Sequence, residues 1–139
     1  METPFQTAKL SKRPIIFLKK RIETFDFKVY TLFLFKIDPI VAKEEIIQYC
    51  RSYNADKLSN TTLYAFIFFD NEKYADFPKR AATYIYDTLE DSLAVQHIKA
   101  VYISNVINGF SKLFYYPTSY FFGHAEEHYY LDGLTKNIK

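Results

Sequence analysis

Three side chains near the C-terminus have the types and spacing of a metal site. His124, Glu127 and His128 stand within five residues of one another. On a helix, residues four apart lie on one face, so both imidazoles could bind one Zn²⁺ ion. Glu127 could then activate a water molecule bound to that ion. The motif indicates a metal-dependent hydrolase with zinc as its cofactor, which we keep as an alternative function.

Over these five residues the spacing resembles the H-x-x-E-H motif of inverted zinc peptidases. The resemblance implies that His124 and His128 are ligands and that Glu127 is catalytic. In that group a downstream glutamate completes the site, whereas no glutamate follows His128 here. Asp132 is the acidic residue that a long helix would bring to the same face. A solvated, charged turn explains the same residues without a metal, and we favour that interpretation.

Other reactive side chains are few. Cys50 is the single cysteine, which excludes an intrachain disulfide and a cysteine zinc cluster, so we expect a reducing, cytoplasmic location. The remaining histidine, His97, falls in an alternating apolar segment and is expected to be structural. The three glycines stand far apart, so a glycine-rich phosphate loop is also excluded. A non-enzymatic role is therefore favoured.

The aromatic content is high, with 14 Phe and 13 Tyr among 139 residues and no Trp. Tyrosine carries a rigid apolar ring with a hydroxyl at its edge, and this makes it frequent at protein interfaces. The leading hypothesis is a domain of unknown process that associates with protein, most simply as a homo-oligomer, through an aromatic surface. The expected interface residues are Phe114, Tyr115, Tyr116, Tyr120, Phe121, Phe122, Tyr129 and Tyr130.

The charge is unevenly distributed along the chain. The whole chain carries +2, but residues 1–21 carry +5 and the rest carries −3. This division predicts a basic, partly ordered N-terminal arm over residues 1–22 and a single α+β domain over 23–139. Binding of nucleic acid by the arm is a second alternative function. The longest apolar runs are about seven residues, too short for a membrane-spanning helix, so no membrane partner is expected.

Periodicity predicts the elements that would position these residues. Alternating apolar positions predict a strand over 25–37, and a run that is apolar on both faces predicts a central strand over 63–69. Between them, Asp38 and Pro39 begin a predicted helix over about 39–53, with Ile46 and Cys50 on its apolar stripe.

Later segments are mostly assigned to strands. Residues 78–90 are rich in β-branched and aromatic side chains, which favours a strand over a helix, and 93–104 alternates in part. Asn108 and Gly109 predict a hairpin between 101–107 and 110–116, and a short helix is predicted over 123–131. The expected fold is therefore α+β, with an antiparallel or mixed sheet of four to five strands and one main helix packed on one face.

Overall fold

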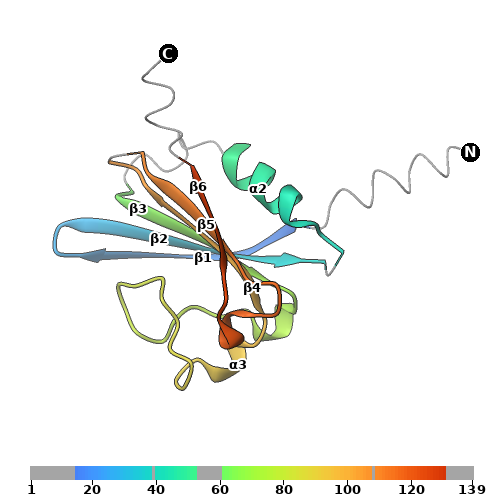
Figure 1. Cartoon of the computed structure of the whole chain (residues 1–139). Coiled ribbons are helices and arrows are strands. Elements are labelled where there is room, and N and C mark those ends of the chain that lie inside the picture. The colour runs from blue at the N-terminus through green and yellow to red at the C-terminus, as the bar shows by residue number, and fades with distance from the viewer. Residues whose placement is uncertain (1–14, 39, 53–60, 108, 131–139) are drawn as a thin grey trace, which may run out of the picture.

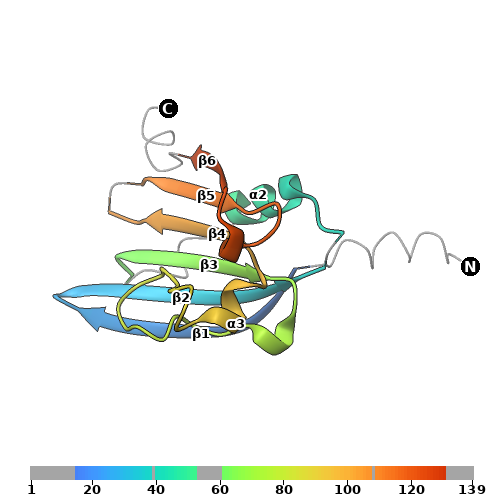
Figure 2. The same cartoon turned by 60° about the horizontal axis from the view of Figure 1, so that its bottom comes forward.

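The computed structural model describes residues 15–38, 40–52, 61–107 and 109–130, with the side chains of Tyr129 and Tyr130 left out. In these ranges six strands form one mixed sheet, and they follow one another across it in chain order (Figure 2). Every neighbouring pair is antiparallel except β2 and β3, which are parallel and joined through helix α2. The elements are β1 (Ile15–Phe25), β2 (Lys28–Ile37), α2 (Lys43–Ser52), β3 (Leu63–Phe69), η2 (Glu72–Tyr74), α3 (Ser92–Val95), β4 (Ile98–Asn105), β5 (Ser111–Tyr115), η3 (Tyr120–Phe122) and β6 (Glu126–Tyr130).

The fold class expected from the sequence was wrong. It had four to five strands and a main helix over about 39–53 as the cover of one face, whereas the sheet has six strands and α2 has ten residues. Both faces are covered: α2 lies on one, and the chain between β3 and β4, residues 70–97, lies on the other (Figure 1). We call these faces the α2 side and the loop side, and we call residues 70–97 the covering loop.

A tight turn divides the strand expected over 25–37. Asp26 and Phe27 have φ of 53° and 63°, and β1 and β2 pair on either side of them. Two successive residues with positive φ form the turn whose twist matches that of a hairpin. Asp26 tolerates this region, and Phe27 is fully exposed there. The boundary expected between residues 22 and 23 therefore falls inside β1.

Helix α2 begins later than expected. The Glu45 side chain accepts a hydrogen bond from the Ala42 backbone N–H at 3.0 Å, which satisfies a free donor at the helix start. Glu44 and Glu45 also lie at the positive end of the helix dipole. Ile46 and Cys50, four residues apart, are both buried against the sheet, as their spacing predicted.

The core has two layers separated by the sheet. On the α2 side, aromatic rings from three neighbouring strands pack together. The ring of Phe35 on β2 lies 5.1 Å from those of Phe66 and Phe68 on β3, and Phe66 lies 5.6 Å from Tyr102 on β4. On the loop side the sheet presents mainly aliphatic residues to the covering loop. Strand β3 supplies both layers, since Ala65 to Phe69 are all fully buried. The prediction of a central strand covered on both faces is confirmed.

The covering loop replaces the strand expected over 78–90. Asp91 organises this segment: one carboxylate oxygen accepts from the Lys79 N–H at 3.0 Å and the other from the Asp87 N–H at 2.9 Å. Tyr86 is buried and donates its hydroxyl to the Asp76 carbonyl at 2.6 Å. The aromatic residues that indicated a strand fill the loop-side core instead.

The end of the chain also differs from the prediction. Residues 92–95 form α3 before β4 begins at Ile98, and residues 126–130 form β6, so the helix expected over 123–131 was wrong. The hairpin around Gly109, which has φ of 75°, joins antiparallel β4 and β5 as expected, while Asn108 lies outside the described residues. In the described ranges, no helix combines the length and apolarity needed to cross a bilayer.

The Cys50 thiol is expected to react with dithionitrobenzoate only when the domain opens. The residue is 2% exposed, and burial raises the pKa of its thiol well above the ordinary value. Because the thiolate is the nucleophile, access and ionisation both oppose reaction in the folded state. The modification rate measured against urea concentration should follow the unfolding transition. Reaction of the native protein at the rate of free cysteine would show that this burial is wrong.

Candidate functional site

The proposed metal residues lie on a strand and not on a helix. His124, with φ of 60°, precedes β6, and Glu127 and His128 are inside it. Neighbouring strand residues point to opposite faces. His128 is opposite buried Leu113, which faces the α2 side, so Glu127 faces the other way. The helical face that would have joined His124 and His128 is not formed, and Asp132 lies outside the described residues.

The carboxylates of β6 have lysine partners. Glu127 forms an ion pair with Lys112 at 2.9 Å. Glu126 forms one with Lys43 of α2 at 2.5 Å, and that hydrogen bond raises the pKa of Lys43 and lowers the pKa of Glu126. Over the described ranges, no three His, Cys, Asp or Glu side chains are grouped to hold a metal ion. These contacts attach β6 to its neighbours.

His97 belongs to a structural contact. Its Nδ1 lies 2.9 Å from a carboxylate oxygen of Asp70, and its ring stacks on Tyr74 with centroids 4.5 Å apart. The Asp70 N–H donates to the His97 carbonyl at 2.9 Å. The contacts join the two ends of the covering loop.

The expected aromatic interface is divided between the two sides of the sheet. Tyr115 packs against the α2-side core, whereas Tyr116 and Tyr120 pack against the loop-side core, where burial raises the pKa of both hydroxyls. Phe121 and Phe122 are 44% and 60% exposed. Phe114 is half-buried with the Lys112 ammonium 4.6 Å from its ring centre. The side chains of Tyr129 and Tyr130 lie outside the described part.

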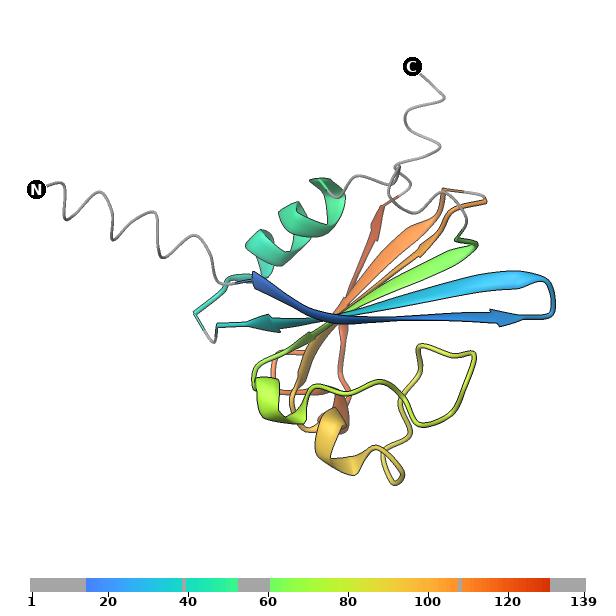
Figure 3. The same cartoon turned by 180° about the vertical axis from the view of Figure 1, so that it is seen from behind.

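A larger exposed apolar surface follows β1, which is the first strand of the sheet. Among the residues described here, no strand pairs with its outer side. The hairpin of β1 and β2 extends away from α2 (Figure 3), so the helix does not cover this end. Four apolar side chains of β1 are at least half exposed, and they are Ile16, Phe17, Ile22 and Phe25. We call the unpaired side of β1 the β1 edge.

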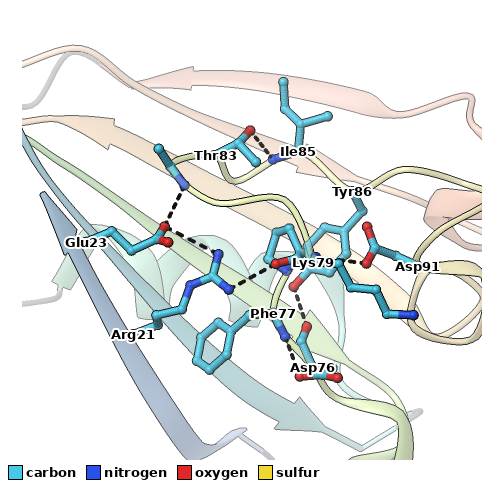
Figure 4. Close-up of polar contacts among 11 residues, drawn as sticks. Arg21, Glu23, Asp76, Phe77, Lys79, Thr83, Ile85, Tyr86 and Asp91 are labelled. Atoms are coloured by element: carbon cyan, nitrogen blue, oxygen red, sulfur yellow. Dashed lines mark hydrogen bonds and ion pairs between the residues drawn. The ribbon is translucent and has the colours of Figure 1, made fainter. Parts of the chain in front are cut away.

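The covering loop holds β1 in place on the loop side (Figure 4). Arg21 donates from Nη1 to the Pro78 carbonyl at 2.9 Å, and its guanidinium lies 5.0 Å from the Phe77 ring centre. Glu23 accepts from the Ala82 N–H at 2.8 Å. With these contacts and its pairing to β2 on either side of Leu18, the strand is formed without a partner on its outer side.

Two features of β1 limit indiscriminate pairing. A register shift between Phe17 and Lys19 marks a bulge at Leu18, and three cations, Lys19, Lys20 and Arg21, follow it. Bulges and lysines are the devices by which edge strands avoid aggregation. Past the bulge, residues 19–25 pair with β2 without interruption. This stretch is where a partner strand has a regular template.

A polar hollow of about 370 Å³ lies beside β1 and the covering loop. Its lining carries three lysines and three acidic residues, so its charge is balanced. The carboxylates of Asp76 and Asp91 already accept backbone N–H groups. Because the positive and negative side chains are equal in number, the lining of the hollow favours neither a cationic nor an anionic ligand. The β1 edge is therefore the better-defined candidate site.

Fold and site together define a mixed α+β sheet domain with an open edge strand. Comparison with known proteins adds no relative, because no protein-family model, no curated protein and no solved structure matches this chain.

Proposed function

We propose that this chain is a protein-association domain and that the β1 edge is its functional site. The observation that carries the proposal is an eleven-residue strand that exposes apolar side chains along an edge with which no other described strand pairs. A partner strand added to such an edge gains main-chain hydrogen bonds, and alternate side chains give specificity. No catalytic group is needed for this function.

The contrast with the rest of the surface supports this choice of site. Ile22 is 59% exposed on the α2 side of β1, where it lies opposite Thr31 in the pairing with β2. Phe17 is 52% exposed on the same side, and its ring contacts those of Phe33 and Phe35 at 6.2 and 5.9 Å. A partner strand would extend this aromatic layer and cover both side chains. The exposed pair Phe121 and Phe122 lies in η3, before the other edge strand β6, which has only five residues and begins with Glu126 and Glu127.

We also propose a cytoplasmic location. Cys50 is the only cysteine and is buried in the core, so the domain is built without a disulfide. Free thiols persist most readily in reducing compartments.

The site can be tested without knowledge of the natural partner. Random peptides about twelve residues long, enough to cover the strand, would be displayed and selected against the full chain. Selected peptides are expected to protect backbone amides of β1 from hydrogen exchange. Ile22→Lys should abolish their binding, since it adds a charge at an exposed position on the edge at little cost to folding.

Leu89→Lys is the matched control, because Leu89 is 85% exposed in the covering loop. Binding to this variant should equal binding to the unmodified chain. Peptides that protect other segments, or that bind Ile22→Lys as well as the control, would contradict the proposed site.

A further inference from the structure

We infer that the strand accepted by the β1 edge is β1 of a second copy, antiparallel and with Ile22 opposite Ile22. This inference rests on the proposed function and names its partner. The result would be a continuous sheet through two copies, with a two-fold axis passing between the two Ile22 residues.

Symmetry limits the possible registers. A two-fold axis perpendicular to the sheet keeps each side chain on its own face, so one residue of β1 must lie opposite its own copy. The pairing with β2 shows which face each residue occupies. Lys20 and Ile22 lie opposite Phe33 and Thr31 on the α2 side, whereas Arg21 and Glu23 lie opposite Leu32 and Tyr30 on the loop side.

Charge excludes most registers in the regular stretch. Centring the pair on Lys19, Lys20, Arg21 or Glu23 places a charged residue directly opposite its own copy. Like charges directly opposite each other on a sheet are destabilising. The Lys20 register adds two further pairs in which Lys19 faces Arg21. Ile22, Thr24 and Phe25 bring no charge opposite themselves. Ile22 is the midpoint of residues 19–25, so of these three centres it alone pairs the whole regular stretch.

The Ile22 register also forms favourable pairs. Arg21 lies opposite Glu23 of the other copy, and the two-fold axis repeats this pair. Within one copy Arg21 and Glu23 already form an ion pair at 3.4 Å, so pairing would bring two arginines and two glutamates together around the axis. Lys19 lies opposite Phe25, and the two exposed Ile22 side chains cover each other. The net charge of +2 gives little overall repulsion between copies.

Disulfide trapping tests the register. In full-length protein carrying Cys50→Ala, Ile22→Cys should form a covalent dimer on mild oxidation, because the two-fold axis brings the two positions face to face. Lys20→Cys alone should give none. Its two copies would be four residues apart along the strand, about 13 Å, beyond the roughly 7 Å Cα separation that a disulfide spans.

A mixed experiment provides a second readout. Lys20→Cys and Thr24→Cys are opposite each other in this register, so a mixture should form the heterodimer while each variant alone remains monomeric on non-reducing gels. Light scattering of the unmodified chain at micromolar concentration should give the mass of a dimer, and Ile22→Lys should give a monomer.

The outcomes separate this inference from the function on which it rests. Crosslinking of Lys20→Cys alone, or a monomer mass with no trapped Ile22→Cys dimer, would overturn the self-pairing. If displayed peptides still bound the β1 edge in that case, strand addition would stand with a different protein as partner. Failure of both experiments would overturn the proposed function as well.

Discussion

Phe66→Ala is expected to lower the free energy of unfolding by about 3–5 kcal/mol, because it empties the centre of the aromatic layer. Phe66 is fully buried on β3. Its ring lies 5.1 Å from Phe35 and 5.2 Å from Phe33, on the neighbouring strand β2. On the other side it contacts Tyr102 of β4 at 5.6 Å. Neighbours on both flanking strands cannot all move inward to fill the cavity.

Urea unfolding followed by circular dichroism measures the effect. Phe121→Ala is the control, since Phe121 is 44% exposed and should lose less than about 1 kcal/mol. If Phe66→Ala does not fold, Phe66→Leu keeps most of the volume and should lose about 1–2 kcal/mol. Equal losses at positions 66 and 121 would show that this layer is not the main core.

Asp91→Asn is expected to lower the free energy of unfolding by about 2 kcal/mol and to loosen the covering loop. Asp91 is 5% exposed, and each of its two carboxylate oxygens accepts one backbone N–H. An asparagine has one acceptor oxygen, so its NH₂ group would face a second donor. One backbone N–H of the pair at Lys79 and Asp87 is then left unsatisfied in a half-buried place.

Hydrogen exchange at Lys79 and Asp87 should accelerate in this variant. Glu90→Gln is the control, since the neighbouring Glu90 is exposed and an exposed change should have an effect within about 0.5 kcal/mol. Because the same loop contacts Arg21 and Glu23 of β1, Asp91→Asn should also weaken peptide binding at the β1 edge. Unchanged exchange at both amides would show that Asp91 does not organise the covering loop.

Two kinds of element could be predicted from the sequence. Strand β3 is apolar at every position, and a run of seven such residues is typical of a strand covered on both faces. The β4 and β5 hairpin has a local turn signal in Gly109, and α2 has the apolar spacing of Ile46 and Cys50. Each signal is local, so it needs no knowledge of the neighbouring strands.

The two outer strands were missed because edge strands are exposed along one side. In β1 the run Lys19, Lys20 and Arg21 interrupts the apolar pattern and indicated a solvated arm, and a bulge at Leu18 breaks the alternation. In β6 the charges of Glu126 and Glu127 suited a helical turn equally well. The lysines that pair with them come from α2 and β5, which no local window contains.

The candidate site could not be predicted from local sequence either. His124, Glu127 and His128 have a metal spacing only if that segment is helical, and pairing with β5 made it a strand. In the sequence, the residues of the β1 edge are separate apolar positions inside a basic segment, and they include Phe17, Ile22 and Phe25. Residues 19–25 show no apolar alternation, because Ile22 and Phe25 are three apart, so the local pattern gave no signal for this part of β1.

The amino-acid order alone determined that residues 63–69 and the stripe of Ile46 and Cys50 must be buried, because apolar periodicity depends only on near neighbours and on the hydrophobic effect. Tertiary structure decided which strands lie at the edges, how residues 78–90 close the loop side, and which aromatic rings remain exposed. Those outcomes depend on contacts between segments far apart in the chain, such as Arg21 with Pro78 and Glu23 with Ala82. No single stretch of sequence contains both partners of such a contact, so the contact cannot be predicted from local sequence.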